Sequence, residues 1–225
     1  MNTQILRRSF LSTVFALSAM TAFGADNENS KVAEVTGLKR HGQRVDYRFE
    51  GLVDKDGRPL LQTDIAGQNI AIYGGYLECI GVCPGAANSI VDGALRLKKE
   101  HPELVENTKF IVVMIKNNNP DETIEQSRAR ADKWQSEGLQ GDQTGIKVYV
   151  SDDQAVLERF KDALGIEIAA GKDGALNHSG LVYLFDQNGI YKDVLRTQKG
   201  SDVFYGDLMN ALGVSKPTVI LTPTR

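Results

Sequence analysis

The sequence is poor in residues that could tie a fold together covalently or through metal ions. It contains only two cysteines and three histidines in 225 residues. Two cysteines cannot form a disulfide framework, so the fold must depend on a hydrophobic core. The pair can still form one disulfide or supply two thiolates to a metal ion.

The sequence also has no large excess of charge of either sign. Lys and Arg number 26 against 29 Asp and Glu, which gives a net charge of −3. Such a mildly acidic chain offers no electrostatic attraction for nucleic acid, so we expect no nucleic-acid partner. With 41% hydrophobic and 24% charged residues, the composition is that of an ordinary globular protein.

Long hydrophobic runs are absent beyond the first 24 residues, and we expect no membrane span in the mature form. Residues 10–22 form the one long apolar run. It follows Arg7 and Arg8 and leads into Ala22-Phe23-Gly24, which has small residues at its first and last positions. This is the plan of a bacterial export signal, so we expect residues 1–24 to be removed and the protein to be periplasmic. The arginine pair also resembles a twin-arginine motif, which leaves two export routes open.

The mature chain divides into a lead-in, one domain and a tail. Residues 25–43 are polar and predict a flexible lead-in. Residues 44–213 carry the regular apolar patterns of a folded domain. Residues 214–225, which contain Pro217 and Pro223, predict a frayed C-terminal tail.

Strand and helix patterns alternate within this domain. Short apolar or alternating runs predict strands at residues 45–52, 70–73, 110–115, 146–150, 181–185 and 190–194. Helical spacing predicts helices at residues 89–99, 121–137, 152–164 (capped by Ser151) and 202–212. The turn at residues 54–59 closes an N-terminal hairpin. This order predicts an α/β fold, a thioredoxin-like mixed sheet with flanking helices and an added N-terminal β-hairpin.

The stretch Cys79-Ile80-Gly81-Val82-Cys83-Pro84 carries the strongest chemical signal. It lies in a predicted strand-to-helix loop, at the sheet edge where α/β folds place their sites. A gap of three residues lets both sulfurs face one point, and the following helix N-terminus favours thiolates. A static disulfide, a redox pair and two metal ligands all fit this spacing. A disulfide closing so small a loop would stabilise the fold little.

His178 is the histidine best placed to join the cysteines. It lies in the glycine-rich segment 171–180, which we predict to be a loop before the strand at residue 181. In a thioredoxin-like sheet that loop approaches the cysteine loop, and two thiolates with one imidazole suit Cu(I) or Zn(II). A histidine of a surface loop without function is the alternative. His41 and His101 are expected to be solvated.

Three other side chains of the predicted helix at residues 121–137 are expected to have structural roles. Arg128 and Arg130 are expected on its solvated face, and Trp134 is expected to pack against the sheet edge.

The chain resembles the Sco/SenC family of copper-binding thioredoxin-like proteins over about residues 45–212. Four segments carry the resemblance, namely residues 52–60, 75–84, 120–123 and 177–186. The resemblance implies that Cys79, Cys83 and His178 bind copper. It further implies a role in assembling the copper site of cytochrome c oxidase, as copper donor or as thiol reductant. Gly74 stands where the family has an aromatic residue.

Two functions follow as hypotheses. The first is a periplasmic copper-binding chaperone that binds one copper ion and delivers it, or reducing equivalents, to a copper enzyme such as cytochrome c oxidase. Its partners would be that copper-receiving protein and a thiol reductant. The second is a thiol-disulfide oxidoreductase that cycles Cys79 and Cys83, with Cys79 as the attacking thiol if it is the more exposed. The first is favoured because it uses all three side chains.

Overall fold

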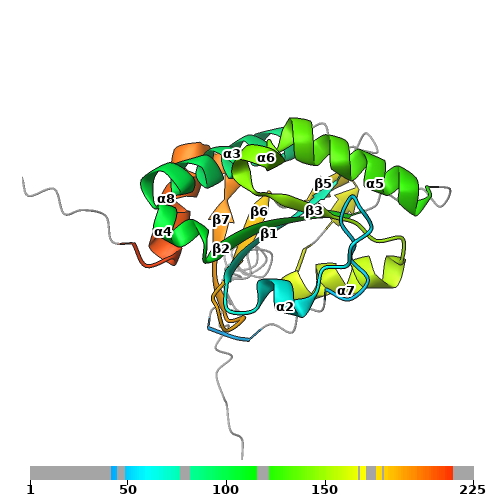
Figure 1. Ribbon diagram of the computed structural model, residues 1–225, viewed down its shortest axis with the longest axis horizontal. Helices are drawn as coiled ribbons and strands as arrows, with labels where there is room; N and C mark the ends of the chain where they lie inside the picture. Colours follow the sequence, from blue (N-terminus) through cyan, green and yellow to red (C-terminus); the bar gives the residue numbers. More distant parts are fainter. Residues whose placement is uncertain are drawn as a thin grey trace, which may run out of the picture.

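A five-stranded mixed sheet forms the centre of the protein. The computed structural model describes residues 42–44, 49–76, 82–115, 122–166, 168–170, 176–178 and 180–214. The expected signal segment at residues 1–24, almost all of the lead-in and the tail from residue 215 lie outside the described residues. Figure 1 shows the arrangement.

The strand order across the sheet is β3-β2-β1-β6-β7. The five strands are β1 (Asn69–Tyr76), β2 (Thr108–Ile115), β3 (Lys147–Tyr149), β6 (Leu181–Phe185) and β7 (Tyr191–Arg196). β2 runs parallel to β1 and β3, whereas β6 runs antiparallel to β1 and β7. This confirms the predicted α/β fold with a mixed sheet. β1 lies at the centre because its apolar run is buried on both faces.

Helices cover both faces of the sheet (Figure 1). One face carries α3 (Val82–Glu100), α4 (Pro102–Val105), α5 (Ile124–Lys133), η2 (Trp134–Gly138), α6 (Gly141–Thr144) and α8 (Ser201–Ala211). The other carries α2 (Gln62–Ile65) and α7 (Gln154–Leu164). A 3-10 turn, η3 (Thr197–Lys199), links β7 to α8, and a separate antiparallel pair joins β4 (Ile168–Ala170) to β5 (Leu176–His178).

Alternate residues of the strands feed two separate cores. Tyr73 belongs to the core under α3 and α8, together with Ile90 and Phe204. Its neighbour Ile72 belongs to the core under α7, together with Phe160. This period of two is the ordinary consequence of a pleated strand. It assigns each side chain of β1 to one face.

Two helix boundaries differ from the prediction. α3 begins at Val82 rather than near residue 89, so Cys83 lies in a helical first turn and not in a loop. Pro84 hid this start in the sequence, although proline is tolerated in a first turn because no helical partner is needed there. The predicted helix at residues 121–137 is instead α5 followed by the single π-helical turn η2.

The N-cap of α7 is Asp153 and not the predicted Ser151. The Ala155 N–H donates to Asp153 Oδ1 at 2.8 Å, and the Asp153 N–H donates to Ser151 Oγ at 3.2 Å. Ser151 therefore orients the capping residue, and Asp153 satisfies the free amide of the first turn.

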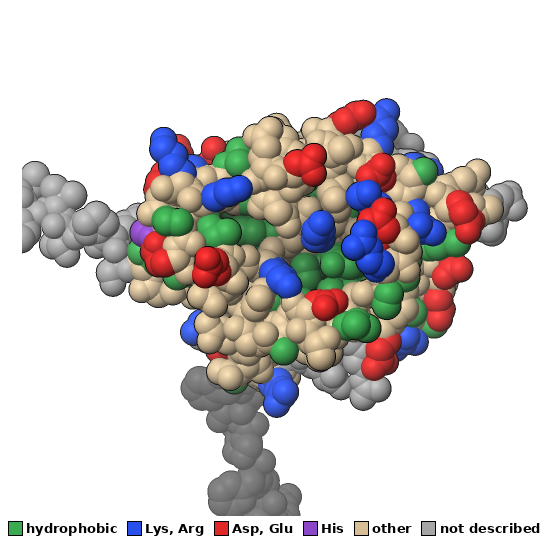
Figure 2. All heavy atoms as spheres, viewed as in Figure 1, with side chains coloured by type: hydrophobic (Ala, Val, Ile, Leu, Met, Phe, Trp, Pro, Cys, Tyr) green, Lys and Arg blue, Asp and Glu red, His purple; other side chains and the backbone are tan. Residues whose placement is uncertain are grey.

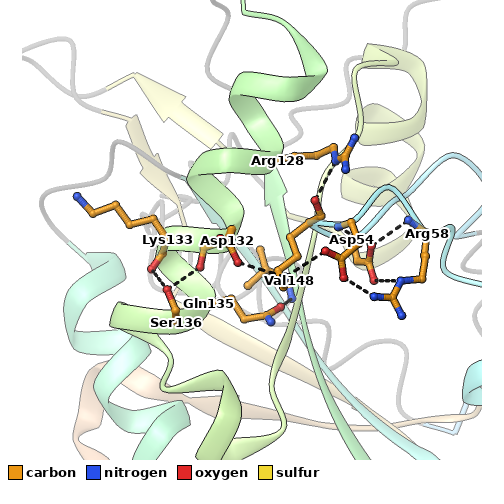
Figure 3. A network of polar contacts seen from close by, with 10 residues as sticks. Asp54, Arg58, Arg128, Asp132, Lys133, Gln135, Ser136 and Val148 are labelled. Atoms are coloured by element: carbon orange, nitrogen blue, oxygen red, sulfur yellow. Dashed lines mark hydrogen bonds and ion pairs between the residues drawn. The ribbon is translucent and has the colours of Figure 1, made fainter.

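The predicted N-terminal hairpin is present as a tight turn with isolated bridges. Asp54 N–H donates to the Arg58 carbonyl at 2.9 Å, and Val53 bridges Pro59. The return strand is short because α2 follows it, and residues 45–48 lie outside the described part. Arg128 Nε donates to the Lys55 carbonyl at 3.0 Å, which fastens this turn to α5 (Figure 3). Arg128 is thus not a purely solvated residue, contrary to the prediction.

The described surface is of mixed charge. Figure 2 shows acidic and basic side chains interspersed over one face, with hydrophobic side chains visible in the hollow between the upper and lower helices. None of the helices within the described ranges is long and apolar enough to span a bilayer.

Candidate metal and thiol site

The carboxyl end of β1 leads directly to the predicted cysteine site. β1 ends at Tyr76, and α3 begins at Val82. Cys79 lies in the intervening segment, outside the described residues. Cys83 occupies the first turn of α3, and only 4% of its surface is exposed. A sulfur in that position lies close to the positive end of the helix, which favours its thiolate form.

Tyr73 reaches the Cys83 sulfur from the sheet. Its hydroxyl donates a hydrogen bond to Cys83 Sγ at 3.5 Å, and only 1% of Tyr73 is exposed. The contact joins the central strand to the first turn of α3. The sequence identified Tyr73 only as part of a buried strand. The contact itself depends on the strand register and on the space left by Gly75, which only the structure shows.

Gly75 makes room for two aromatic rings beside the site. A Cβ atom at Gly75 would lie 3.0 Å from Tyr73 Cε1 and 3.1 Å from Trp134 Cη2. Both rings therefore pack onto the backbone of β1 just before the cysteine segment. Trp134 thus reaches the central strand, while the turn η2 that carries it also contacts the edge strand β3, where the sequence predicted this tryptophan to pack.

Gly74 faces the opposite layer, and its lack of a side chain is also explained by packing. A Cβ atom there would lie 2.7 Å from Ile166 Cδ1 and 3.1 Å from Ile115 Cδ1. These aliphatic side chains occupy the space beside the strand. Ile115 belongs to β2 and Ile166 follows the end of α7, so a side chain at position 74 would find no room in this packing.

His178 is the last residue of β5, where it pairs with Ile168 of β4. The predicted glycine-rich loop is therefore partly strand, since residues 176–178 form backbone pairs. The side chain of His178 is not among the described ones. β6 begins shortly after His178 and runs antiparallel to β1, with Tyr73 opposite Val182. The backbone before β6 and the backbone after β1 consequently leave the sheet at the same edge.

A buried carboxylate lies just before α5. Glu122 is buried, and Ser127 Oγ donates to its Oε1 at 2.5 Å. The Arg130 guanidinium forms an ion pair with the same oxygen. Arg130 is therefore engaged with a buried acid and not simply solvated, as the sequence suggested. The ion pair ties Glu122 to α5, and Thr123 caps that helix by accepting from the Gln126 N–H.

Of the other two histidines, only His101 is among the described residues. His101 lies before α4, where its Nδ1 is 3.2 Å from Glu103 Oε1. His41 lies outside the described residues. Within the described ranges, no three His, Cys, Asp or Glu side chains form a group that could hold a metal ion. Cys79 and the ring of His178 lie outside the described part of the structure.

Comparison with known proteins gives the fold and the family. A family model described as SCO1/SenC matches residues 38–213. No curated protein matches the chain.

Among solved structures, yeast Sco1 with copper bound superposes with a TM-score of 0.58 at 15% identity, covering 79% of this chain and 91% of that one. Bradyrhizobium japonicum ScoI with copper bound gives 0.54 at 18% identity, covering 76% and 99%. A SCO1/SenC family lipoprotein from Bacillus anthracis str. Ames gives 0.54 at 18% identity, covering 77% and 96%. These similarities confirm the predicted thioredoxin-like fold. Since the family model spans most of the sequence, this chain belongs to the SCO1/SenC family.

Proposed function

We propose that this protein binds one copper ion through Cys79, Cys83 and His178 and delivers it, or reducing equivalents, to a copper enzyme such as cytochrome c oxidase. The observation that carries the proposal is the placement of Cys83, buried in the first turn of α3 at the carboxyl end of β1. The family match and the copper-bound relatives support the same reading.

The donor set suits copper as cargo. Two thiolates and one imidazole are soft to intermediate ligands, which select Cu(I) and also accept Cu(II). The helix N-terminus at Cys83 lowers the cost of holding a negative sulfur. His178 comes from the segment before β6, which leaves the sheet at the same edge as the cysteine segment. A site with three protein ligands leaves room for a recipient protein to take over the ion.

We further propose that the protein acts in the periplasm after removal of residues 1–24. The charged start, short apolar run and small residues before Ala25 support this placement. In that oxidising compartment the two thiols need a thiol reductant to stay ready for copper.

Anaerobic titration with Cu(I) tests the proposal. The reduced protein should bind about one ion per chain, because three ligands complete a Cu(I) site. Cys79→Ser/Cys83→Ser should abolish stoichiometric binding, and His178→Ala should weaken it. His101→Ala is the matched control and should bind as the wild type does. Undiminished binding by the double serine variant would refute the assignment.

The second candidate function, thiol-disulfide exchange, is favoured by one observation, the burial of Cys83. A partner disulfide could not easily reach the buried Cys83 sulfur. The Cys79 thiolate would therefore attack the partner disulfide, form a mixed disulfide and release one partner thiolate. Cys83 would then attack the Cys79 sulfur, form the internal disulfide and release the second partner thiolate. The partner gains two electrons and the cysteine pair loses two. Cys83→Ser should trap the mixed disulfide on Cys79, and failure to trap any partner would argue against this role.

A further inference from the structure

We infer that the Tyr73 hydroxyl is a positioning group for the Cys83 sulfur. Its hydrogen bond shifts the redox equilibrium of the site toward the reduced state. The inference rests on the proposed role of Cys83 as a copper and redox ligand. Tyr73 itself does not bind copper in this scheme. It acts by donating a hydrogen bond to Cys83 Sγ.

The fold holds the Tyr73 ring in the direction that this contact requires. Tyr73 lies on the central strand, and its ring leans along β1 over Gly75, toward the edge where Cys83 lies. Any side chain at Gly75 would meet that ring at 3.0 Å. Trp134 packs against the same point, with Cη2 3.1 Å from that Cβ position, so the two rings share the space that Gly75 leaves open.

The hydrogen bond should favour the reduced form of the cysteine pair. A donor stabilises an anionic sulfur more strongly than the neutral sulfur of a disulfide, because charge-assisted hydrogen bonds are the stronger ones. Burial of both groups excludes water, which would otherwise replace the tyrosine as donor. When oxidised glutathione takes two electrons from the Cys79 thiol and the Cys83 thiolate, one proton is released and the resulting neutral disulfide gains less from Tyr73.

The same hydrogen bond should favour Cu(I) over Cu(II) at the site. It withdraws electron density from the sulfur, and hydrogen bonds around a cysteine ligand tune the potential of a bound copper ion. A sulfur that donates less charge stabilises the oxidised ion less. Tyr73 would thus favour the reduced form of both the cysteine pair and the bound copper ion.

Tyr73→Phe tests the inference because it removes only the hydroxyl. Tyr183→Phe is the matched control, since Tyr183 lies on the neighbouring strand, is equally buried at 1% exposure and faces the opposite core. Each metal-free variant is equilibrated with mixtures of reduced and oxidised glutathione. In Tyr73→Phe the equilibrium constant for disulfide formation should rise about tenfold, equivalent to a potential lower by about 30 mV. Tyr183→Phe should leave it unchanged.

The copper complex gives a separate spectroscopic readout. Loss of the hydrogen bond should move the sulfur-to-copper charge-transfer band of the Cu(II) form to longer wavelength in Tyr73→Phe but not in Tyr183→Phe. In the wild type, preparation in D2O should shift the Cu–S stretching frequency. This measurement does not depend on the folding of any variant. Unchanged glutathione equilibrium, band and stretching frequency would overturn the inference. The glutathione measurement needs no metal, so failure of the proposed copper function would appear separately, as absence of copper binding by the wild type.

Discussion

The indole of Trp134 lies directly on the backbone of Gly75, where a Cβ atom would come within 3.1 Å of ring atom Cη2. The π-helical turn η2 supplies this tryptophan, and β1 supplies the glycine. Such turns are frequent at functional sites. Here the turn places an aromatic cover over the strand that leads into the cysteine segment.

Gly75→Ala should therefore destabilise the protein. The added methyl group would crowd Tyr73 and Trp134 together, and overpacking of this kind costs about 1–3 kcal/mol. Urea unfolding followed by the fluorescence of Trp134, the one tryptophan in the sequence, measures the effect. Gly206→Ala in α8 is the control, because a Cβ atom there meets nothing within 4 Å. It should stabilise the helix by about 0.5–1 kcal/mol. Equal stability of Gly75→Ala and the wild type would contradict the described packing.

Gln135→Ala should lower stability through a lost hydrogen bond. Gln135 is buried, and its Oε1 accepts from the Val148 N–H at 2.9 Å (Figure 3). Leaving that amide without its acceptor costs about 1–3 kcal/mol. Hydrogen exchange at Val148 should accelerate with the loss of stability. Ser136→Ala, at the exposed neighbouring position, should change the free energy of unfolding by less than about 0.5 kcal/mol. Slow exchange at Val148 in Gln135→Ala would show that another acceptor suffices.

Asp153→Ala should cost about 1 kcal/mol, because it removes the side chain that caps α7. Asp152→Ala is the control for charge alone. Asp152 is exposed and lies one residue before the cap, so its loss should alter stability by less than about 0.5 kcal/mol. Chemical denaturation of both variants distinguishes the hydrogen bond to Ala155 from the general attraction of acids to a helix N-terminus. Equal losses would assign the effect to charge.

Alkaline pH should weaken the contact between α3 and α8 through Tyr205. Burial, together with the hydrogen bond that its hydroxyl donates to Glu100, raises the pKa of Tyr205 to about 12. The folded state therefore keeps the phenol proton between pH 10 and 12, whereas the unfolded chain releases it. The stabilising contribution is complete below pH 10 and declines as pH rises toward 12.

Unfolding free energies of the wild type and Tyr205→Phe, measured from pH 8 to 12, test this expectation. The advantage of the wild type should shrink above pH 10, because the phenylalanine has no proton to lose. A constant difference between the two proteins across that range would contradict the raised pKa.

The fold was predictable because its central strands have continuous apolar runs, which fit few structures other than a strand buried on both faces. Ile70–Tyr73 and the run of β2 are too continuous for a half-exposed element, and both form central strands. The start of α3 was not predictable from the same rules. Pro84 and Gly85 normally mark a loop, and only the docked position of the helix shows that they lie within its first turns.

The candidate site was predictable in residue type but not in its surroundings. Cys79, Cys83 and His178 follow from spacing, chemistry and the family resemblance, and their joint binding of copper stays a prediction. The Tyr73 contact depends on strand register and on the space left by Gly75, neither of which a single sequence encodes locally. The engagement of Arg130 with Glu122 escaped prediction for the same reason, since helical position alone places Arg130 outward.

The outer strands of the sheet also bear on unwanted assembly between molecules. On β3 and just beyond it, the outward amides of Val148 and Val150 are taken by Gln135 and by the Val53 carbonyl. On the far side, Tyr191 exchanges hydrogen bonds with residues 42 and 43. Unsatisfied strand borders template fibre growth and unwanted assembly. A second molecule therefore finds these positions already taken and cannot lengthen the sheet through them.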